Sequence, residues 1–522
     1  MKINRHVAAI SFKSSIKQVF ILLTLICCFQ IHGQVPGIEW QNALGGSLND
    51  FGWDAVQTPD NGYIITGIAG SNNGDVSGNN GNQDGWLVKL NNAGVIQWQN
   101  ALGGPGTDFL YELKDTSDGG YISIGTSDAN GGDVTGNHGL FDFWVTKLNS
   151  SGDLQWQKSL GGSQDDFGRS IVRAVGGGYV LAGSASSNDG DVTGHHGEGD
   201  FWIVKIGATG SIEWKHAYGG SLYEVPHEII STNDGGFMVV GETSSNDGDV
   251  TGQQGLSDFW VVKLNEFGVM EWQKTYGGSD IDSAASIKQT SDGGYIVVGQ
   301  TRSNDGDVSG NNGNYDVWVI KISASGILQW QKTLGGSDID TGNGIIITPN
   351  RKYVISAQSR SNNGDVSGNH GQSDAWVALL FDTGDVQWQN SIGGSDVESA
   401  ESIIITNDGG YLVSGFTWSN NGDVNGNHGG SDVWIVKLAP DPLEIEDFTL
   451  GNNGIYPNPA TDILHLESKT AIDKVSVFDM LGKEILSQET TNTIDVSALS
   501  PGIYIVQLSE GKSISNHKLI KN

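Results

Sequence analysis

Acidic side chains recur in one polar stretch of the sequence, SNDGDVSGNNGNYDVW at 303–318. Close versions of it begin at Ser71, Ser187, Ser245, Ser361 and Ser419, and a degraded version lies around Asn130. The repeated acids are the pairs Asp75 and Asp84, Asp133 and Asp142, Asp191 and Asp200, Asp249 and Asp258, Asp307 and Asp316, Asp365 and Asp374, and Asp423 and Asp432. Carboxylate oxygens are ligands that calcium prefers. Aspartates in such stretches also cap backbone N–H groups in turns. The pattern therefore predicts either calcium sites or structural turns.

The segment DVSGNNGNYD at 307–316 resembles the calcium loop of FG-GAP propeller repeats, whose pattern is D-x-[DN]-x-[DN]-G-x-x-D. It differs by one inserted residue, and the second and third ligand positions hold Ser, Thr, Asn, Gln or His where that family has Asp. The resemblance implies that calcium is a cofactor and that the fourteen paired aspartates hold it.

A third acid recurs in the motif GGS-x-x-[DE], which joins one repeat to the next. Its members are Asp50, Asp108, Asp166, Glu224, Asp282, Asp340 and Glu398. In a propeller this connection lies on the same face as the polar stretch. We therefore expect three acids per repeat near one face of the molecule.

A specific binding site requires positions at which the repeats differ. One such position, near the start of each repeat's innermost predicted strand, holds Trp53, Tyr111, Arg169, His227, Ala285, Asn343 and Glu401. The next position holds Asp54, Glu112, Ser170, Glu228, Ser286, Gly344 and Ser402. We expect these residues to surround the mouth of a central channel, where they either bind a small polar or glycan ligand or are solvated positions that have drifted.

No motif of a known catalytic mechanism is present, and we assign no catalytic residue. The sequence has no G-x-S-x-G elbow, zincin helix or phosphate-cradling loop. A glycosidase needs two carboxyl groups at a fixed separation, and Glu112, Glu228 or Glu401 with a nearby aspartate could supply them. Because acids are so abundant here, that match decides little.

The elements that must position these residues follow from a strict period. Trp40, Trp98, Trp156, Trp214, Trp272, Trp330 and Trp388 are spaced by 58 residues. Trp86, Trp144, Trp202, Trp260, Trp318, Trp376 and Trp434 have the same spacing. Two further tryptophans, Trp53 and Trp418, fall outside both series and are candidates for a surface role.

Each repeat contains four runs with strand character and no helical period. Between Ile281 and Asp338 these runs are SIKQT, YIVVGQT, VWVIKI and ILQWQKTLGG, separated by turns and the long polar stretch. Four strands per repeat predict an all-β, seven-bladed β-propeller over 34–438. The chain enters at the fourth strand type (37–46) and leaves at the third (432–438). We therefore expect the N-terminal strand to close the last blade, which would pair both exposed edges. Both tryptophan series are expected to be buried between blades.

The N-terminus and the charge indicate the compartment. Lys2, Arg5, Lys13 and Lys17 precede the apolar run at 19–29, which predicts a secretory signal peptide at 1–33. Both cysteines, Cys27 and Cys28, lie within it, so no disulfide is available downstream. Removing its four basic residues from the 28 leaves a net charge of 24 − 60 = −36. Such a charge argues against nucleic acid and anionic membranes as partners. No further apolar stretch is long enough to span a membrane.

The repeats end at Leu438, and residues 439–454 read as a linker. The segment 455–522 carries YPNP at 456–459, D-x-x-G-K at 479–483, LSPGIY at 499–504 and a terminal basic and apolar strand. These motifs resemble the type A C-terminal sorting domain of the type IX secretion system of Bacteroidetes. The resemblance implies a small β-sandwich that is recognised by the secretion machinery and directs the protein outside the cell or onto its surface.

Three functions fit these observations. The first is a secreted or surface-displayed propeller that binds a glycan or protein ligand. The second is a secreted polysaccharide-active enzyme, and the third is a calcium-stabilised structural or adhesion protein.

Overall fold

The computed structural model describes residues 35–441, 454–467, 472–479, 483–489, 492–510 and 513–522. The predicted signal peptide at 1–33 lies outside these residues, as does most of the predicted linker. All regular elements in the described segments are β-strands. None of those segments contains a helix long and apolar enough to cross a membrane.

Between Ile38 and Leu438 the strands form seven four-stranded antiparallel sheets. The first strands of these sheets are β2 (Asp50–Gln57), β6 (Asp108–Asp115), β10 (Asp166–Arg173), β14 (Glu224–Ser231), β18 (Asp282–Gln289), β22 (Asp340–Ile347) and β26 (Glu398–Ile405). The second strands are β3 (Tyr63–Ala69), β7 (Tyr121–Ser127), β11 (Tyr179–Ala185), β15 (Phe237–Thr243), β19 (Tyr295–Thr301), β23 (Tyr353–Ser359) and β27 (Tyr411–Thr417). The third strands are β4 (Asp84–Leu90), β8 (Asp142–Leu148), β12 (Asp200–Ile206), β16 (Asp258–Leu264), β20 (Asp316–Ile322), β24 (Asp374–Leu380) and β28 (Asp432–Leu438). The fourth strands are β5 (Ile96–Leu102), β9 (Leu154–Leu160), β13 (Ile212–Tyr218), β17 (Met270–Tyr276), β21 (Leu328–Leu334), β25 (Val386–Ile392) and, for the last sheet, β1 (Ile38–Leu44).

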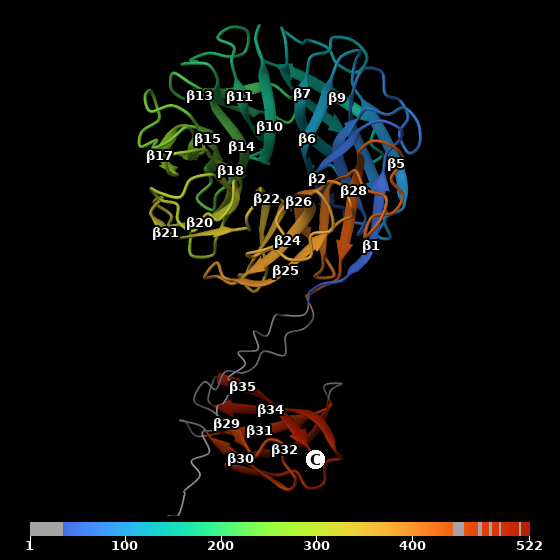
Figure 1. Cartoon of the computed structure of the whole chain (residues 1–522), viewed down its shortest axis with the longest axis vertical. Helices are drawn as coiled ribbons and strands as arrows, with labels where there is room; N and C mark the ends of the chain where they lie inside the picture. The colour runs from blue at the N-terminus through green and yellow to red at the C-terminus, as the bar shows by residue number, and fades with distance from the viewer. Residues whose placement is uncertain (1–34, 442–453, 468–471, 480–482, 490–491, 511–512) are drawn as a thin grey trace, which may run out of the picture.

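The sheets are arranged radially, with the first strands nearest the middle and the fourth strands at the rim (Figure 1). β1 pairs antiparallel with β28, with Ala43 opposite Trp434. β2 of the first sheet contacts β26, β27 and β28 of the last. The N-terminal strand therefore belongs to the last sheet, as its strand type predicts.

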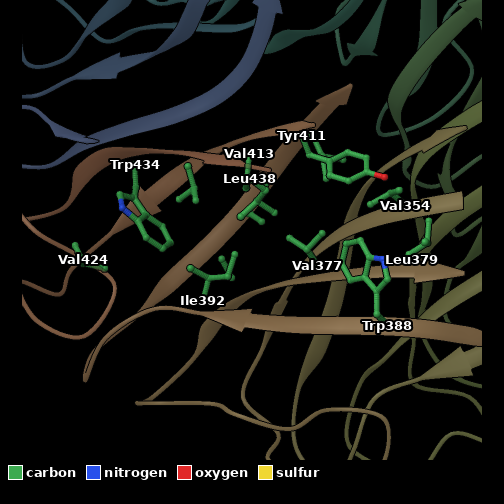
Figure 2. Close-up of a cluster of buried hydrophobic side chains, with 14 of the residues drawn as sticks. Val354, Val377, Leu379, Trp388, Ile392, Tyr411, Val413, Val424, Trp434 and Leu438 are labelled. Atoms are coloured by element: carbon green, nitrogen blue, oxygen red, sulfur yellow. The ribbon is translucent and has the colours of Figure 1, made fainter. Parts of the chain in front are cut away.

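The tryptophans of the third strands form the centres of the cores between sheets, as predicted. All seven are almost completely buried. Trp86 Nε1 donates to Gln99 Oε1 at 2.7 Å, and Trp434 makes the same bond to Gln41 in β1. Figure 2 shows the core around Trp434, Ile392, Val413 and Leu438, side chains that come from two neighbouring sheets.

The outer tryptophans pack against the following sheet, but only Trp388 is buried as predicted, and the other six are half-buried. A Cβ on Gly94, in the turn between β4 and β5, would lie 2.9 Å from the Trp40 ring. Gly94 has a φ of 79°, which glycine adopts without strain. No such turn covers Trp388, because the following sheet is the last one, in which the paired strands β28 and β1 are not consecutive in the chain. Asp441 replaces it, accepting bonds from Trp388 Nε1 at 3.1 Å and Tyr411 Oη at 2.7 Å.

A buried lysine in the third strand ties each of several sheets to its first turn. Lys321 donates to Asp292 at 3.0 Å, to Gln329 Oε1 at 3.1 Å and to the Ile322 carbonyl at 3.3 Å. The β22–β25 sheet has lost both charged partners, since Leu379 and Asn350 stand in their places. The remaining acceptor, Gln387 Oε1, is buried there without a hydrogen bond.

The C-terminal region contains two further sheets. One consists of β29 (Gly454–Tyr456), β30 (Ile463–Glu467) and β33 (Thr493–Asp495). The other has the order β32-β31-β34-β35, with bounds Glu484–Glu489, Lys474–Phe478, Gly502–Glu510 and Ser513–Lys521. Both sheets supply side chains to one apolar core, including Leu464 and Val506. Asn458 of the YPNP motif donates to the Lys518 carbonyl at 2.6 Å and accepts from the Ile520 N–H at 2.8 Å.

Candidate functional site

The first strands of the seven sheets surround a central pocket of about 310 Å³. All six residues predicted as ligand-binding line it: Trp53, Tyr111, Arg169, His227, Asn343 and Glu401. Ala285 completes the set of ring residues, as we call this repeat position. The positions at which the repeats differ most are therefore brought together in space.

A backbone irregularity places the ring residues. In β2, Gly52 pairs with Gly67 and Asp54 with Thr66, so Trp53 is left without a partner in β3. The same shift occurs at the ring residue of the other first strands, for example at Arg169 in β10. A β-bulge of this kind re-aims side chains. Here it lets both the ring residue and its successor line the pocket. Each first strand also begins at the recurrent acid, which is earlier than the run SIKQT predicts.

The acids that follow the ring residues link neighbouring first strands. Glu112 accepts from the Ile171 N–H at 2.7 Å and from Ser170 Oγ at 2.5 Å. Glu228 accepts from the Ile287 N–H at 2.6 Å. Asp54 accepts a weaker bond from the Leu113 N–H, at 3.3 Å. These hydrogen bonds hold the wall of the pocket together. Glu112 or Glu228 would have to break its bonds to act as the acid or base of a glycosidase.

Two lysines in the wall were not identified from the sequence. Lys114 forms an ion pair with Glu112, and Lys288 pairs with Glu228 at 2.6 Å. Comparison of the repeats could have found them, because their equivalents are apolar (Val56, Val172, Ile230, Ile346 and Ile404). Their positive charges balance the negative charges of the wall carboxylates Glu112 and Glu228.

Burial sets the protonation of the remaining groups. It raises the pKa of Asp54 to about 6 against the lowering effect of Lys114. It lowers the pKa of His227 to about 4, and Arg169 adds to this effect, so His227 is neutral at physiological pH. Burial also raises the pKa of Glu401, opposed by the hydrogen bond from Ser399.

One side of the pocket is aromatic. Trp53 lies 5.8 Å from Tyr111 and 6.3 Å from Phe51 between ring centroids, and Phe109 lies 5.8 Å from Tyr111. At the Phe51 position the later repeats hold Ser283, Thr341 and Ser399. The ring is thus aromatic at β2 and β6, where Trp53 and Tyr111 lie, and polar at β22 and β26, where Asn343 and Glu401 lie.

The recurrent acids meet at junctions between sheets, but not in the pairs that one polar stretch contains. A Cβ on Gly277 would lie 2.5 Å from Asp258 Oδ1 and 2.6 Å from Asp282 Oδ2. The Gly277 N–H donates to Asp307 at 3.3 Å. Asp316, from the same stretch as Asp307, lies instead at the next junction with Asp340 and Asp365. Each junction therefore combines acids from three different segments.

These junction carboxyls are mostly hidden from solvent. The Asp50 and Asp84 series are fully buried, and the Asp75 series is half-buried except for the exposed Asp365. The acidic face expected from the sequence is therefore largely internal. Hydrogen-bond donors are provided in part: Asp282 accepts from the Gly278 N–H at 2.8 Å and from Ser303 Oγ at 2.9 Å. The imidazoles of His138, His196, His370 and His428 lie 2.6–2.8 Å from the second acid of their own stretch.

One oxygen at most junctions has no donor. Oδ1 is buried without a hydrogen bond in Asp84, Asp142, Asp200, Asp258, Asp316 and Asp432. Burial, together with Asp282 and Asp307, raises the pKa of Asp258 to about 7. Burial and neighbouring carboxylates likewise raise the pKa of Asp84 and Asp316 to about 6. Among the described residues no three His, Cys, Asp or Glu side chains are arranged as a ready metal site. The calcium assignment stays a prediction.

A larger hollow of about 660 Å³ lies near the outer strands β21 and β25. Asp365 and Trp388 line it, and each of these two positions holds the same residue type in all seven repeats. Because the repeats agree there, the central pocket is the better candidate for a specific site.

Residues 454–522 match the secretion system C-terminal sorting domain family. This domain marks proteins that type IX secretion exports to the cell surface or outside the cell. The protein is therefore an exported, all-β repeat protein with a sorting domain at its C-terminus.

Two kinds of similarity extend over the repeats. The chain is 22% identical over 431 residues to regulatory protein FlaEY of Caulobacter vibrioides, which covers 74% of this chain and 44% of that protein. The chain thus spans less than half the length of this curated relative. Among solved structures it is similar to BamB from Moraxella catarrhalis, at 13% identity and a TM-score of 0.38 over 78% of this chain and 100% of that one. It is also similar to the Pan2 WD40 domain from Neurospora crassa, at 10% identity and a TM-score of 0.43 over 79% and 98%.

Proposed function

We propose that the protein is a secreted or cell-surface binding module, built as a closed seven-bladed propeller that takes a small polar ligand in its central pocket. In this proposal residues 1–33 are the signal peptide, 34–438 the propeller, 439–454 the linker and 455–522 the sorting domain. Pairing of β1 with β28 and the contacts of β2 with β26–β28 support closure of the ring.

The observation that carries the binding function is the convergence of the six predicted residues on one pocket. Repeat positions that only maintain the fold keep one residue type, as the third-strand tryptophans do. The ring residues instead differ from repeat to repeat and face a shared space. Two polar atoms in this space, Trp53 Nε1 and Arg169 Nε, are buried without a hydrogen-bond partner. Buried donors are normally paired, so a ligand that accepts from them would be stabilised.

Glycan-array binding followed by calorimetry on the purified full chain tests this proposal. Trp53→Ala is expected to weaken binding of any ligand found by tenfold or more, because an aromatic wall of the pocket is lost. Trp418→Ala is the matched control, since Trp418 also lies outside both tryptophan series but is 44% exposed. Equal affinity of wild type and Trp53→Ala would place the binding site elsewhere.

A hydrolase is distinguished by turnover. In the pocket Glu112 and Glu228 are held by backbone donors and lysines, which leaves Glu401 as the freest glutamate. If the protein releases reducing ends from soluble glucans or hemicelluloses, and Glu401→Gln abolishes this activity, then the protein is an enzyme and the binding-module proposal is wrong.

A further inference from the structure

Arg169 carries a positive charge into the central pocket without a counter-charge. Its guanidinium lies 4.5 Å over the Tyr111 ring, and its Nε is buried without a hydrogen-bond acceptor. Within residues 35–441 it makes no ion pair, unlike Lys114 and Lys288 in the same wall. The neighbouring His227 is neutral, because burial and Arg169 lower its pKa to about 4.

The carboxylates of the pocket, by contrast, already accept hydrogen bonds from groups of the protein, and two of them are paired with lysines. Glu112 and Glu228 each have a lysine, a serine hydroxyl and a backbone N–H. Asp54 accepts from the Leu113 N–H and from Ser402 Oγ at 3.1 Å. Glu401 accepts from Ser399 Oγ at 2.6 Å. Among the lining residues Arg169 is therefore the one cationic side chain without a carboxylate partner.

The shape of the ring adds a second requirement. On one side of Arg169, which lies on β10, come the aromatic Tyr111 on β6 and then Trp53 on β2. Asn343 and Glu401 come from β22 and β26, on the polar side of the ring. A ligand that fits all three regions has a carboxylate, a flat apolar face and hydroxyl groups.

Building on the proposed binding function, we propose that the central pocket binds a sugar acid. Its carboxylate pairs with the Arg169 guanidinium, one face of its ring packs on Trp53, and its hydroxyls reach Asn343 and Glu401. Arginine suits this role because its planar donors match a carboxylate in two-point geometry. The large negative charge of the chain acts weakly on such a ligand, since exposed charges are screened within about 8 Å at physiological salt.

Calorimetry on the purified full chain tests the assignment with four probes: methyl glucuronoside, methyl galacturonoside, methyl glucoside and N-acetyltyrosine. Wild type is expected to bind at least one uronoside tenfold or more tightly than the neutral glucoside. Arg169→Gln is expected to abolish this preference while weak binding of the neutral sugar persists.

Arg302→Gln is the matched control, because it removes the same charge. Arg302 also lies over a tyrosine, Tyr315 at 5.9 Å, but does not line the pocket. This variant is expected to keep the uronoside preference, and equal melting temperatures of the two variants show that both fold.

Each other outcome overturns a defined part. Trp53-dependent binding of neutral sugars with no carboxylate preference contradicts the sugar acid and leaves the binding module intact. Tighter binding of N-acetyltyrosine than of either uronoside makes the ligand an amino-acid carboxylate instead. Absence of Trp53-dependent binding to any array glycan or probe contradicts the sugar acid and the binding module together.

Discussion

Single carboxyl groups at the sheet junctions couple this fold to pH. Asp258 in the folded protein has a pKa of about 7, and Asp84, Asp108 and Asp316 have values of about 6, all above the ordinary value of 3.8. The folded state therefore binds protons that the unfolded state has released. This contribution to stability is present below pH 4 and is lost as the pH rises through 6 and 7. The lowered pKa of Asp60 and Asp292, about 2, acts only in more acidic solution.

We expect the free energy of unfolding to fall between pH 5 and pH 8, and to fall less in Asp258→Asn. Asparagine keeps an acceptor for the Gln254 N–H and presents a neutral donor toward Asp282. The difference between the variant and wild type should reach about 1 kcal/mol or more, since one pKa unit corresponds to about 1.4 kcal/mol. Urea denaturation at both pH values measures it. Asp60→Asn is the control, and an equal pH dependence in all three proteins would contradict the prediction.

Calcium binding at the same residues would change the stability in a different way. A cation bound only by the folded state raises stability, by about 2.7 kcal/mol at a hundredfold excess over its Kd. Because backbone and hydroxyl donors already occupy much of the junction carboxylates, we expect EDTA to leave the Tm at pH 8 unchanged. A drop of several degrees on adding EDTA, restored by calcium, would instead establish the aspartates of the polar stretches as calcium ligands.

At the scale of the element, the lysine in the third strand shows how a repeat tolerates change. The β22–β25 sheet lacks the lysine and the turn aspartate together, whereas β12 keeps Lys205, which pairs with Glu213 at 3.1 Å where its turn aspartate is missing. Loss of one partner alone would leave a buried ammonium group or its acceptors unmatched, which is costly.

Lys321→Leu, which copies Leu379 into an intact sheet, is expected to destabilise the protein by about 1–3 kcal/mol. It leaves Gln329 and the Ile322 carbonyl without their shared donor. Lys332→Leu removes an exposed lysine that pairs with Asp385 and should cost less than about 1 kcal/mol. Chemical denaturation compares the two, and similar losses would contradict a role of the buried lysine.

The strands and their order could be predicted because the 58-residue period repeats every signal seven times. The ring residues could be predicted for the complementary reason, that Trp53, Arg169 and Glu401 break the repeat. What could not be predicted depends on distances between segments. The shift at Trp53 is a backbone event, and the grouping of Asp258 with Asp282 and Asp307 joins three segments. Whether Arg169 finds a carboxylate partner is likewise a property of the folded ring.

At the scale of the whole molecule, the last of the seven sheets in residues 35–441 is the one whose third and fourth strands, β28 and β1, are paired without a covalent turn between them. In the first sheet that turn is the five residues 91–95 between β4 and β5. A circular permutant that joins Leu438 to Ile38 through a copy of this turn, with new ends between Asn92 and Ala93, should fold. We expect its Tm to lie within a few degrees of the Tm of the unpermuted 34–438 segment, because the permutant gains one exposed turn and opens another.

Calorimetric melting and circular dichroism of both proteins provide the comparison. An unfolded permutant beside a folded parent segment would contradict a ring closed by β1.

The pairing of β1 with β28 also sets an order of events for an exported chain. The hydrogen bond from Trp434 to Gln41 spans 393 residues, so the first strand to emerge must wait for the last before its sheet is complete. The sorting domain, at 454–522, follows that last strand in the chain. The repeats can therefore reach their finished form only as the export address itself becomes available, which ties delivery of the protein to completion of its fold.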